Sequence, residues 1–188
     1  MPDAYKDGGF ALTDKAIISK FRGAGKDLIK QVGKQIITGK FNLTTVSLPI
    51  KVMDHKTVVE LVASIGCVAP MFLNAAALAK DPVERMKYVM VASVAFIGPM
   101  HSFDKPLNPI IGETYQGQLP DGSNVYMEQI SHHPPISYML HEGADNLFRF
   151  SGYSAFSAKA WLNSIKLKVV GLKTITFPKD GGKITFNN

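Results

Sequence analysis

The sequence has a single cysteine and lacks any apolar run long enough to span a membrane. Cys67 has no partner within the chain for an internal disulfide, and we expect it to pack in the core. The longest apolar runs, residues 65–79 and 88–100, are broken by proline, asparagine or glycine. Both fall short of the roughly 18 apolar residues that a spanning helix needs. The N-terminus also has no secretory signal pattern, so a cytoplasmic protein is predicted.

Acidic residues are fewer than basic ones, with 15 Asp and Glu against 21 Lys and Arg, which gives a net charge of +6. This balance favours an anionic partner, which could be nucleic acid, a phospholipid headgroup or an acidic protein. Charge alone does not choose among them. The length of 188 residues and the 46% hydrophobic content predict one folded domain with a substantial core.

The basic residues are concentrated near the N-terminus, where apolar residues recur every three or four positions. This pattern predicts a basic amphipathic helix within residues 1–40, capped by Thr13 or Asp14. Such a helix can lie on an anionic membrane or pack on its own protein with solvated lysines, and both interpretations stay open. Its glycines, at positions 23, 25 and 33, lower its helix propensity.

The remainder predicts an α+β, mostly β fold in which helices precede strands. After an extended stretch over 41–52, helices are expected at 55–67, 71–79 and 82–98, the last capped by Asp81 and ended by Gly98-Pro99. From Tyr115 the period changes to that of an antiparallel meander. Lys166 and Lys168 alternate with apolar residues there, which predicts one buried strand face. The expected strands cover residues 125–130, 136–141, 147–153, 155–162, 164–170, 173–177 and 183–186.

Two segments, Lys105–Glu113 and Glu128–Pro135, concentrate polar side chains among prolines. In the first, two prolines fix φ angles and discourage helix, so that Lys105 and Asn108 project from a stiff loop. Rigid donors of this kind are good anion ligands.

The second segment, EQISHHPP, combines a strand pattern with two histidines. Strand alternation places Glu128 and His132 on one face and Gln129 and His133 on the other. Imidazoles at a strand end can donate hydrogen bonds to phosphate, more strongly when protonated.

Other interpretations of these segments are a stiff connector and a strand end with satisfied hydrogen bonds. A hydrolase would need Ser131, or Glu128, to act beside a histidine, but adjacent residues of one strand do not meet. A zinc site is disfavoured because adjacent strand histidines diverge and no third ligand has a standard spacing.

EQISHHPP resembles the fingerprint of the oxysterol-binding protein family, and KPLNPIIGETYQG is similar to the loop that precedes it in that family. The similarity runs from about residue 41 to the C-terminus, and GYSAFSAKAWLNSIKLKV also fits. The basic N-terminal helix resembles the family only in kind.

The resemblance implies an incomplete antiparallel β-barrel around a hydrophobic tunnel that holds one lipid. Residues 1–188 would form a single lipid-binding domain, with a lid or helix over 1–40, a helical region and the KPLNP loop over 41–114, and barrel strands over 115–188. Family domains continue further, with additional strands and basic ligands, so we expect this chain to lack the C-terminal part. The edge left by the strand near residues 184–186 should be covered by another chain or by missing sequence.

Carried over by position, Lys105, Asn108, His132 and His133 would bind a phosphoinositide headgroup. Glu128 and Gln129 would support the strand. The implied function is intracellular lipid binding and transfer between apposed membranes, exchanging a sterol or phosphatidylserine for phosphatidylinositol 4-phosphate. The alternative is a membrane-binding sensor or scaffold without transfer. We expect no enzyme activity, cofactor, metal or nucleic-acid partner, and peripheral association with an anionic membrane.

Overall fold

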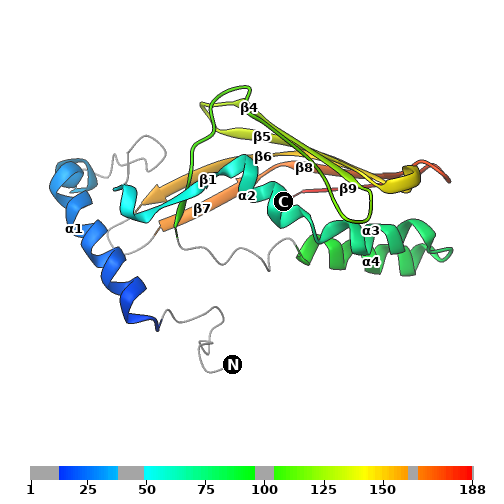
Figure 1. Cartoon of the computed structure of the whole chain (residues 1–188), viewed down its shortest axis with the longest axis horizontal. Helices are drawn as coiled ribbons and strands as arrows, with labels where there is room; N and C mark the ends of the chain where they lie inside the picture. The colour runs from blue at the N-terminus through cyan, green and yellow to red at the C-terminus, as the bar shows by residue number, and fades with distance from the viewer. Residues whose placement is uncertain (1–12, 38–48, 96–103, 161–164, 188) are drawn as a thin grey trace. The chain divides into compact units, whose positions relative to one another are not determined.

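The computed structural model describes residues 13–37, 49–95, 104–160 and 165–187 (Figure 1). The chain divides into two compact units that interleave along the sequence. The first unit holds Met1–Met53, Phe103–Lys105 and Ala158–Lys166. The second unit holds Asp54–Ser102, Pro106–Ser157 and Leu167–Asn188. The assignment of all 188 residues to one domain stays a prediction.

The predicted N-terminal helix is present in the first unit as α1 (Lys15–Ile37). Asp14 begins it: one carboxylate oxygen accepts hydrogen bonds from the backbone N–H of Ala16 at 2.8 Å and of Ile17 at 3.1 Å. These bonds satisfy donors that have no partner inside the first helical turn. Of the two caps that the sequence offered, the structure uses Asp14.

Two ion pairs hold α1 to other segments of the first unit. The Lys20 ammonium lies 2.8 Å from the Asp104 carboxylate, and Lys51, in the short 3-10 helix η2 (Ile50–Val52), lies 2.6 Å from Asp27. The hydrogen bond and charge of Lys51 lower the pKa of Asp27. The helix therefore has partners in its own unit, as the packed-helix interpretation requires, although many of its lysines remain exposed.

The second helix begins later than the sequence pattern predicted. His55 lies in strand β1 (Met53–Thr57), and α2 covers Val58–Gly66. A reciprocal capping box sets this start: the Thr57 hydroxyl accepts from the Glu60 N–H at 3.3 Å, and the Glu60 carboxylate accepts from the Thr57 N–H at 2.8 Å. Since these two bonds satisfy the first-turn donors, the helix begins at residue 58.

The next two helices, α3 (Ala69–Leu78) and α4 (Pro82–Ala95), agree with the prediction, including the Asp81 cap of α4. The proposed Gly98-Pro99 stop lies outside the described residues. Within the described part of the chain, no helix alone has the length and apolar character to cross a membrane. Helices α2 and α3 meet that test only together, across a bend of 49°.

An antiparallel sheet of seven strands forms most of the second unit, in the order β3-β4-β5-β6-β8-β9, with β7 paired to β6. The expected segments 147–153 and 155–162 are one strand, β6, because its pairing with β5 continues through residue 155. The sequence pattern missed β3 as a separate strand. The bounds are β3 (Thr114–Gln118), β4 (Asn124–Ser131), β5 (Ile136–Glu142), β6 (Arg149–Ala160), β7 (Ile165–Val170), β8 (Leu172–Phe177) and β9 (Gly182–Asn187).

The α+β, mostly β prediction is confirmed, and over the described residues the sheet is open, with β3 and β9 as its end strands. A separate two-stranded sheet pairs β1 with β2 (Lys105–Leu107).

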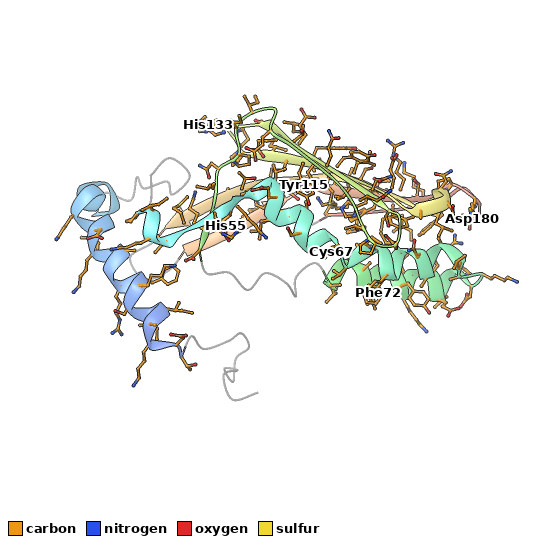
Figure 2. The ribbon with its side chains drawn as sticks, viewed as in Figure 1. His55, Cys67, Phe72, Tyr115, His133 and Asp180 are labelled. Atoms are coloured by element: carbon orange, nitrogen blue, oxygen red, sulfur yellow. The ribbon has the colours of Figure 1, made fainter. Side chains whose placement is uncertain are left out.

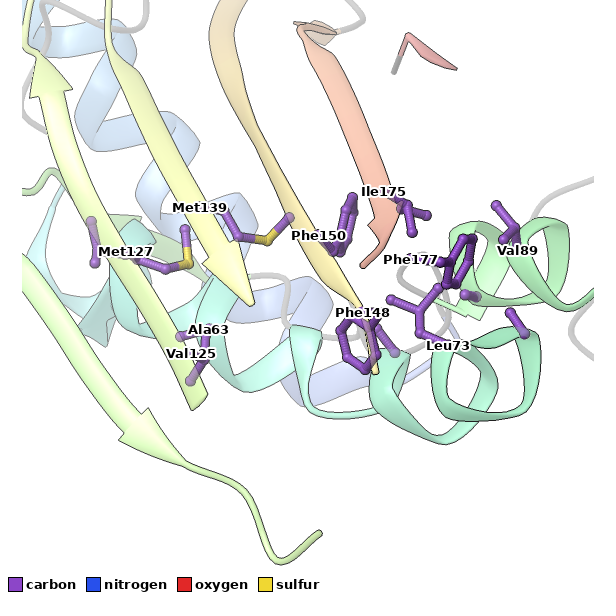
Figure 3. Close-up of a cluster of buried hydrophobic side chains, with 14 residues drawn as sticks. Ala63, Leu73, Val89, Val125, Met127, Met139, Phe148, Phe150, Ile175 and Phe177 are labelled. Carbon is purple, nitrogen blue, oxygen red and sulfur yellow. The ribbon is translucent and has the colours of Figure 1, made fainter. Parts of the chain in front are cut away.

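One face of the large sheet packs on α2, α3 and α4 (Figure 3). Phe148, Phe150 and Phe177 from the sheet side meet Leu73 of α3 and Val89 of α4 in a single buried cluster. Along β4 the buried and exposed residues alternate, as expected for a strand with one covered face.

The β5–β6 connection is a tight turn with an unusual backbone. Asp145 and Asn146 have φ angles of 51° and 55°, and the Leu147 N–H donates to the Ala144 carbonyl at 3.1 Å. Two successive positive φ angles are characteristic of the turns that match the twist of a hairpin.

Two burial predictions are wrong. Cys67 is exposed because it caps the C-terminal end of α2 rather than facing the core. Lys168, Val169 and Val170 of β7 are all exposed, so the expected buried face of this strand is absent at these described positions. Among the described strands, β7 pairs with β6 alone and lies off the main path of the sheet. At such a position an alternating sequence pattern does not by itself bury a side chain.

Candidate functional site

Backbone hydrogen bonds join the end of the first proline-rich motif to the second motif, at one end of the large sheet. The Gly112 N–H donates to the Gln129 carbonyl at 2.9 Å, and the Gln129 N–H donates to the Glu113 carbonyl at 3.0 Å. Strands β3 and β4 continue this pairing, with Thr114 opposite Glu128. Segments that are separate in the sequence therefore lie beside each other.

The loop that leads into β3 is closed by Glu113. Its carboxylate accepts from the Ile110 N–H at 3.1 Å, and its own N–H donates to the Ile110 carbonyl at 3.1 Å. Gly112 has a φ of +77°, a conformation that glycine adopts without steric cost. Pro109 is buried beneath the loop, while Asn108 is exposed.

His132 and His133 lie in the turn between β4 and β5, at the end of the hairpin (Figure 2). The prediction that they continue the strand alternation is wrong, because the register shifts between Gln129 and Ser131 and the strand ends before His132. Their ring centroids are 4.6 Å apart, in an edge-on arrangement at 63°, and both residues are exposed. The histidines are neighbours and do not diverge as the zinc argument assumed.

Gln129 occupies the base of this turn. Its side-chain nitrogen donates to the Ser131 carbonyl at 2.7 Å, and its side-chain oxygen accepts from the Ser137 hydroxyl at 2.6 Å. Both Gln129 and Ser137 are buried on the helix-covered face of the sheet, whereas Glu128 is exposed on the opposite face. The side chain of Gln129 thus links the two strands just before the histidine turn.

The predicted ligands do not all belong to one unit. Asn108, His132 and His133 are in the second unit, whereas Lys105 is the last residue of a segment of the first unit. Lys105 is half-buried, and this burial lowers its pKa.

Sequence reasoning missed the roles of Ser137 and Glu113 in holding these segments. Glu113 lies in the first motif. Its position three residues after Ile110 allows its carboxylate to accept from the Ile110 N–H, which was a signal for a closed loop. Ser137 gave no local signal, because its bond to Gln129 forms only when β4 and β5 pair. Among the described residues, no group of three His, Cys, Asp or Glu side chains could hold a metal ion.

Two further titratable residues are buried on the helix-covered face. The Lys173 ammonium donates to the Tyr153 carbonyl at 3.0 Å and to the Ser154 hydroxyl at 2.9 Å, and burial lowers its pKa to about 8. Burial lowers the pKa of His141 to about 4, an effect that the charge of Asp121 opposes. Within the described part of the chain, neither ring nitrogen of His141 has a hydrogen-bond partner.

Comparison with known proteins identifies the class. The family model described as oxysterol-binding protein matches residues 28–188. The chain belongs to the oxysterol-binding protein family, as the two motifs predicted. It is 37% identical over 182 residues to oxysterol-binding protein 9 of Dictyostelium discoideum, covering 97% of this chain and 42% of that protein. It is 32% identical over 149 residues to oxysterol-binding protein-related protein 7 of Homo sapiens, covering 78% of this chain and 17% of that protein.

Solved structures agree with the fold. The Osh1 ORD domain in complex with cholesterol has a TM-score of 0.70 at 25% identity, covering 85% of this chain and 38% of that one. The Osh3 ORD in complex with PI(4)P from Saccharomyces cerevisiae has a TM-score of 0.69 at 23% identity, covering 84% and 41%. The chain therefore spans less than half the length of these relatives.

Proposed function

We propose that this chain binds the headgroup of a phosphoinositide, phosphatidylinositol 4-phosphate, through Lys105, Asn108, His132 and His133. The observation that carries the proposal is the pair of backbone hydrogen bonds at Gln129, which brings Gly112 and Glu113 of the first motif beside the second motif. Gln129 would hold the turn from the buried face, and Glu128 would support the strand from the exposed face.

The side chains suit an anion. Each imidazole can donate a hydrogen bond to a phosphate oxygen, and a protonated imidazole adds charge. The Asn108 amide is a neutral donor for phosphate or inositol hydroxyl oxygens. An ammonium that is partly withdrawn from water, like that of Lys105, interacts more strongly with an anion than a fully hydrated one does. This is recognition without bond making or breaking, so the proposal includes no catalytic residue, cofactor or metal.

We further propose that the chain takes part in non-vesicular lipid transfer, with a sterol or phosphatidylserine as the second ligand. The support comes from the relatives: one solved structure holds cholesterol and another holds PI(4)P. The basic helix α1 and the net charge of +6 support an anionic membrane surface as the partner. We expect a cytoplasmic protein that associates peripherally with membranes.

Native mass spectrometry after incubation with mixed liposomes tests the proposal by counting the lipids retained per chain. We expect retained phosphatidylinositol 4-phosphate to fall in Lys105→Ala and in the double variant His132→Ala, His133→Ala. His55→Ala is a matched control, because His55 is an exposed histidine of β1 outside both motifs. Retention equal to wild type in both test variants would refute the site.

A second candidate function is a lipid sensor or scaffold that binds a membrane and transfers nothing. The open sheet over the described residues favours it, because β3 and β9 are both end strands there. Co-sedimentation with phosphatidylinositol 4-phosphate liposomes, without extraction of lipid from donor liposomes, would identify this function. Extraction of one lipid per chain would identify the carrier.

A further inference from the structure

Three isoleucines are exposed beside the histidine turn, on the two segments that Gln129 joins. Ile110 is 71% exposed, Ile111 is 68% exposed and Ile130 is 46% exposed. We call these three residues the isoleucine tip. Ile110 and Ile111 precede Gly112, which bonds to Gln129, and Ile130 directly follows Gln129. The tip therefore belongs to the same end of the second unit as Asn108, His132 and His133.

Part of the backbone at the tip is already hydrogen-bonded within the protein. The N–H of Ile110 donates to the Glu113 carboxylate, and the carbonyl of Ile110 accepts from the Glu113 N–H. The Gly112 N–H donates to Gln129. Moving a backbone group out of water costs free energy mainly when the group loses its hydrogen bonds. Transfer of these backbone groups of Ile110 and Gly112 out of water should therefore cost little free energy.

We propose that the isoleucine tip inserts among the acyl chains of a lipid bilayer, next to the headgroup that His132 and His133 contact. This deepens the proposed function and rests on it for the identity of the neighbouring ligand. Insertion would place the two histidines at the depth of the headgroups, where a polar ring is well solvated. The phosphoinositide would then be bound while it is still in the membrane.

The size of the tip favours a bilayer over a protein partner. A stable protein interface buries about 800 Å² on each side and involves about 20 residues or more. Three isoleucines at the end of a sheet offer much less. A bilayer accepts a small apolar projection, because each buried methylene contributes independently to partitioning.

Helix α4 provides the comparison surface. Val83 is 60% exposed and Val94 is 65% exposed, so this helix presents apolar side chains about as accessible as those of the tip. Neither residue belongs to the two motifs. If exposed apolar side chains bound membranes wherever they lie, this helix would contribute to membrane binding as well.

Co-sedimentation with vesicles of phosphatidylcholine and phosphatidylserine, with and without phosphatidylinositol 4-phosphate, tests the inference. We expect Ile110→Asn with Ile111→Asn to lower partitioning about tenfold on both kinds of vesicle. Ile110→Leu with Ile111→Leu should retain wild-type partitioning. Val83→Asn with Val94→Asn should also bind like wild type, and unchanged thermal melting would show that each variant is folded.

The outcomes separate this inference from the proposed function. The double variant His132→Ala, His133→Ala should lose only the increment that phosphatidylinositol 4-phosphate adds. If the histidine variant keeps that increment while the tip variant still binds less, the headgroup site is refuted and insertion of the tip is supported. Wild-type partitioning of the asparagine tip variant, or an equal loss in the α4 variant, would overturn the insertion.

An environment-sensitive dye gives a second readout. With Cys67→Ser as background, a dye attached through Ile111→Cys should shift its emission to the blue when vesicles are added. A dye on the native Cys67, which is exposed at the end of α2, is the matched control and should not shift. Equal shifts at the two positions would contradict insertion of the tip.

Discussion

The two ends of the β4–β5 ladder differ in what their side chains contact. At the end that leads into β6, Phe148 is buried against the helices, and His141 has no exposed surface. At the other end, the turn that carries His132 and His133 is exposed. The first end supplies buried apolar surface and the second supplies donors that face solvent. The difference teaches that the buried apolar contacts and the proposed headgroup site lie on the same two strands but at opposite ends, so substitutions should separate their effects.

The largest expected effect on stability is at the buried end. Phe148→Ala removes a fully buried aromatic ring and should lower the free energy of unfolding by about 3–5 kcal/mol. Urea denaturation measures this. Tyr138→Ala is the control, because Tyr138 is 40% exposed on the other face of the same sheet and should cost much less. Equal losses of unfolding free energy in the two variants would contradict the contrast between the buried end and the exposed face.

His141 should make the buried end sensitive to acid. Its folded-state pKa of about 4 lies below the ordinary 6.5, so the unfolded chain binds a proton first as the pH falls. The stability contributed by neutral His141 is complete above pH 6.5 and is lost between 6.5 and 4, by up to about 3 kcal/mol. In His141→Gln the unfolding free energy should fall less between pH 7 and pH 5 than in wild type. Identical pH dependence would exclude this residue as the cause.

An intermediate effect is expected at Gln129, which is buried at the base of the histidine turn. Gln129→Leu leaves the Ser137 hydroxyl and the Ser131 carbonyl without their partner, which should cost about 1–3 kcal/mol. Glu128→Gln, at the next position but on the exposed face, is the control and should change stability by less than about 0.5 kcal/mol. If Gln129→Leu is as stable as wild type, the turn does not depend on this link.

The smallest effect on stability is expected at the histidines. His132→Ala with His133→Ala should change the unfolding free energy by less than about 0.5 kcal/mol, because both residues are exposed. The same protein should lose phosphoinositide binding in a liposome assay. A stability loss comparable to that of Gln129→Leu would mean that the ring contact between the histidines is structural.

Local signals explain which elements could be predicted from the sequence. The caps at Asp14 and Asp81 act within one helical turn, so the starts of α1 and α4 were predictable. The start of α2 was missed because the helix was placed from His55, whereas the Thr57–Glu60 capping box is the local signal that sets its start. The continuous β6 was missed because small residues in it resemble a break, and only pairing with β5 shows that the strand continues.

The residues of the proposed site could be selected from the sequence, but the local geometry around them was less predictable. The motifs were visible in the sequence, and so was the stiff loop around Pro109. The register shift near Gln129 could not be predicted, because it depends on how β4 pairs with β5. This shift places His132 in a turn and not in a strand. A register shift of one position moves side chains to the opposite face of a sheet. The alternation of the sequence therefore could not assign the two histidines to faces. The bond between Ser137 and Gln129 likewise exists only in the paired sheet.

The turn between β5 and β6 restricts how this sequence can vary in evolution. Asp145 and Asn146 both hold positive φ angles, which asparagine, aspartate and glycine adopt more readily than other residues. Both side chains are exposed, and both lie at the end of the hairpin away from the histidines. Selection for folding alone should therefore limit these two positions to that small group of residues, so their constancy among relatives would not indicate a role in binding.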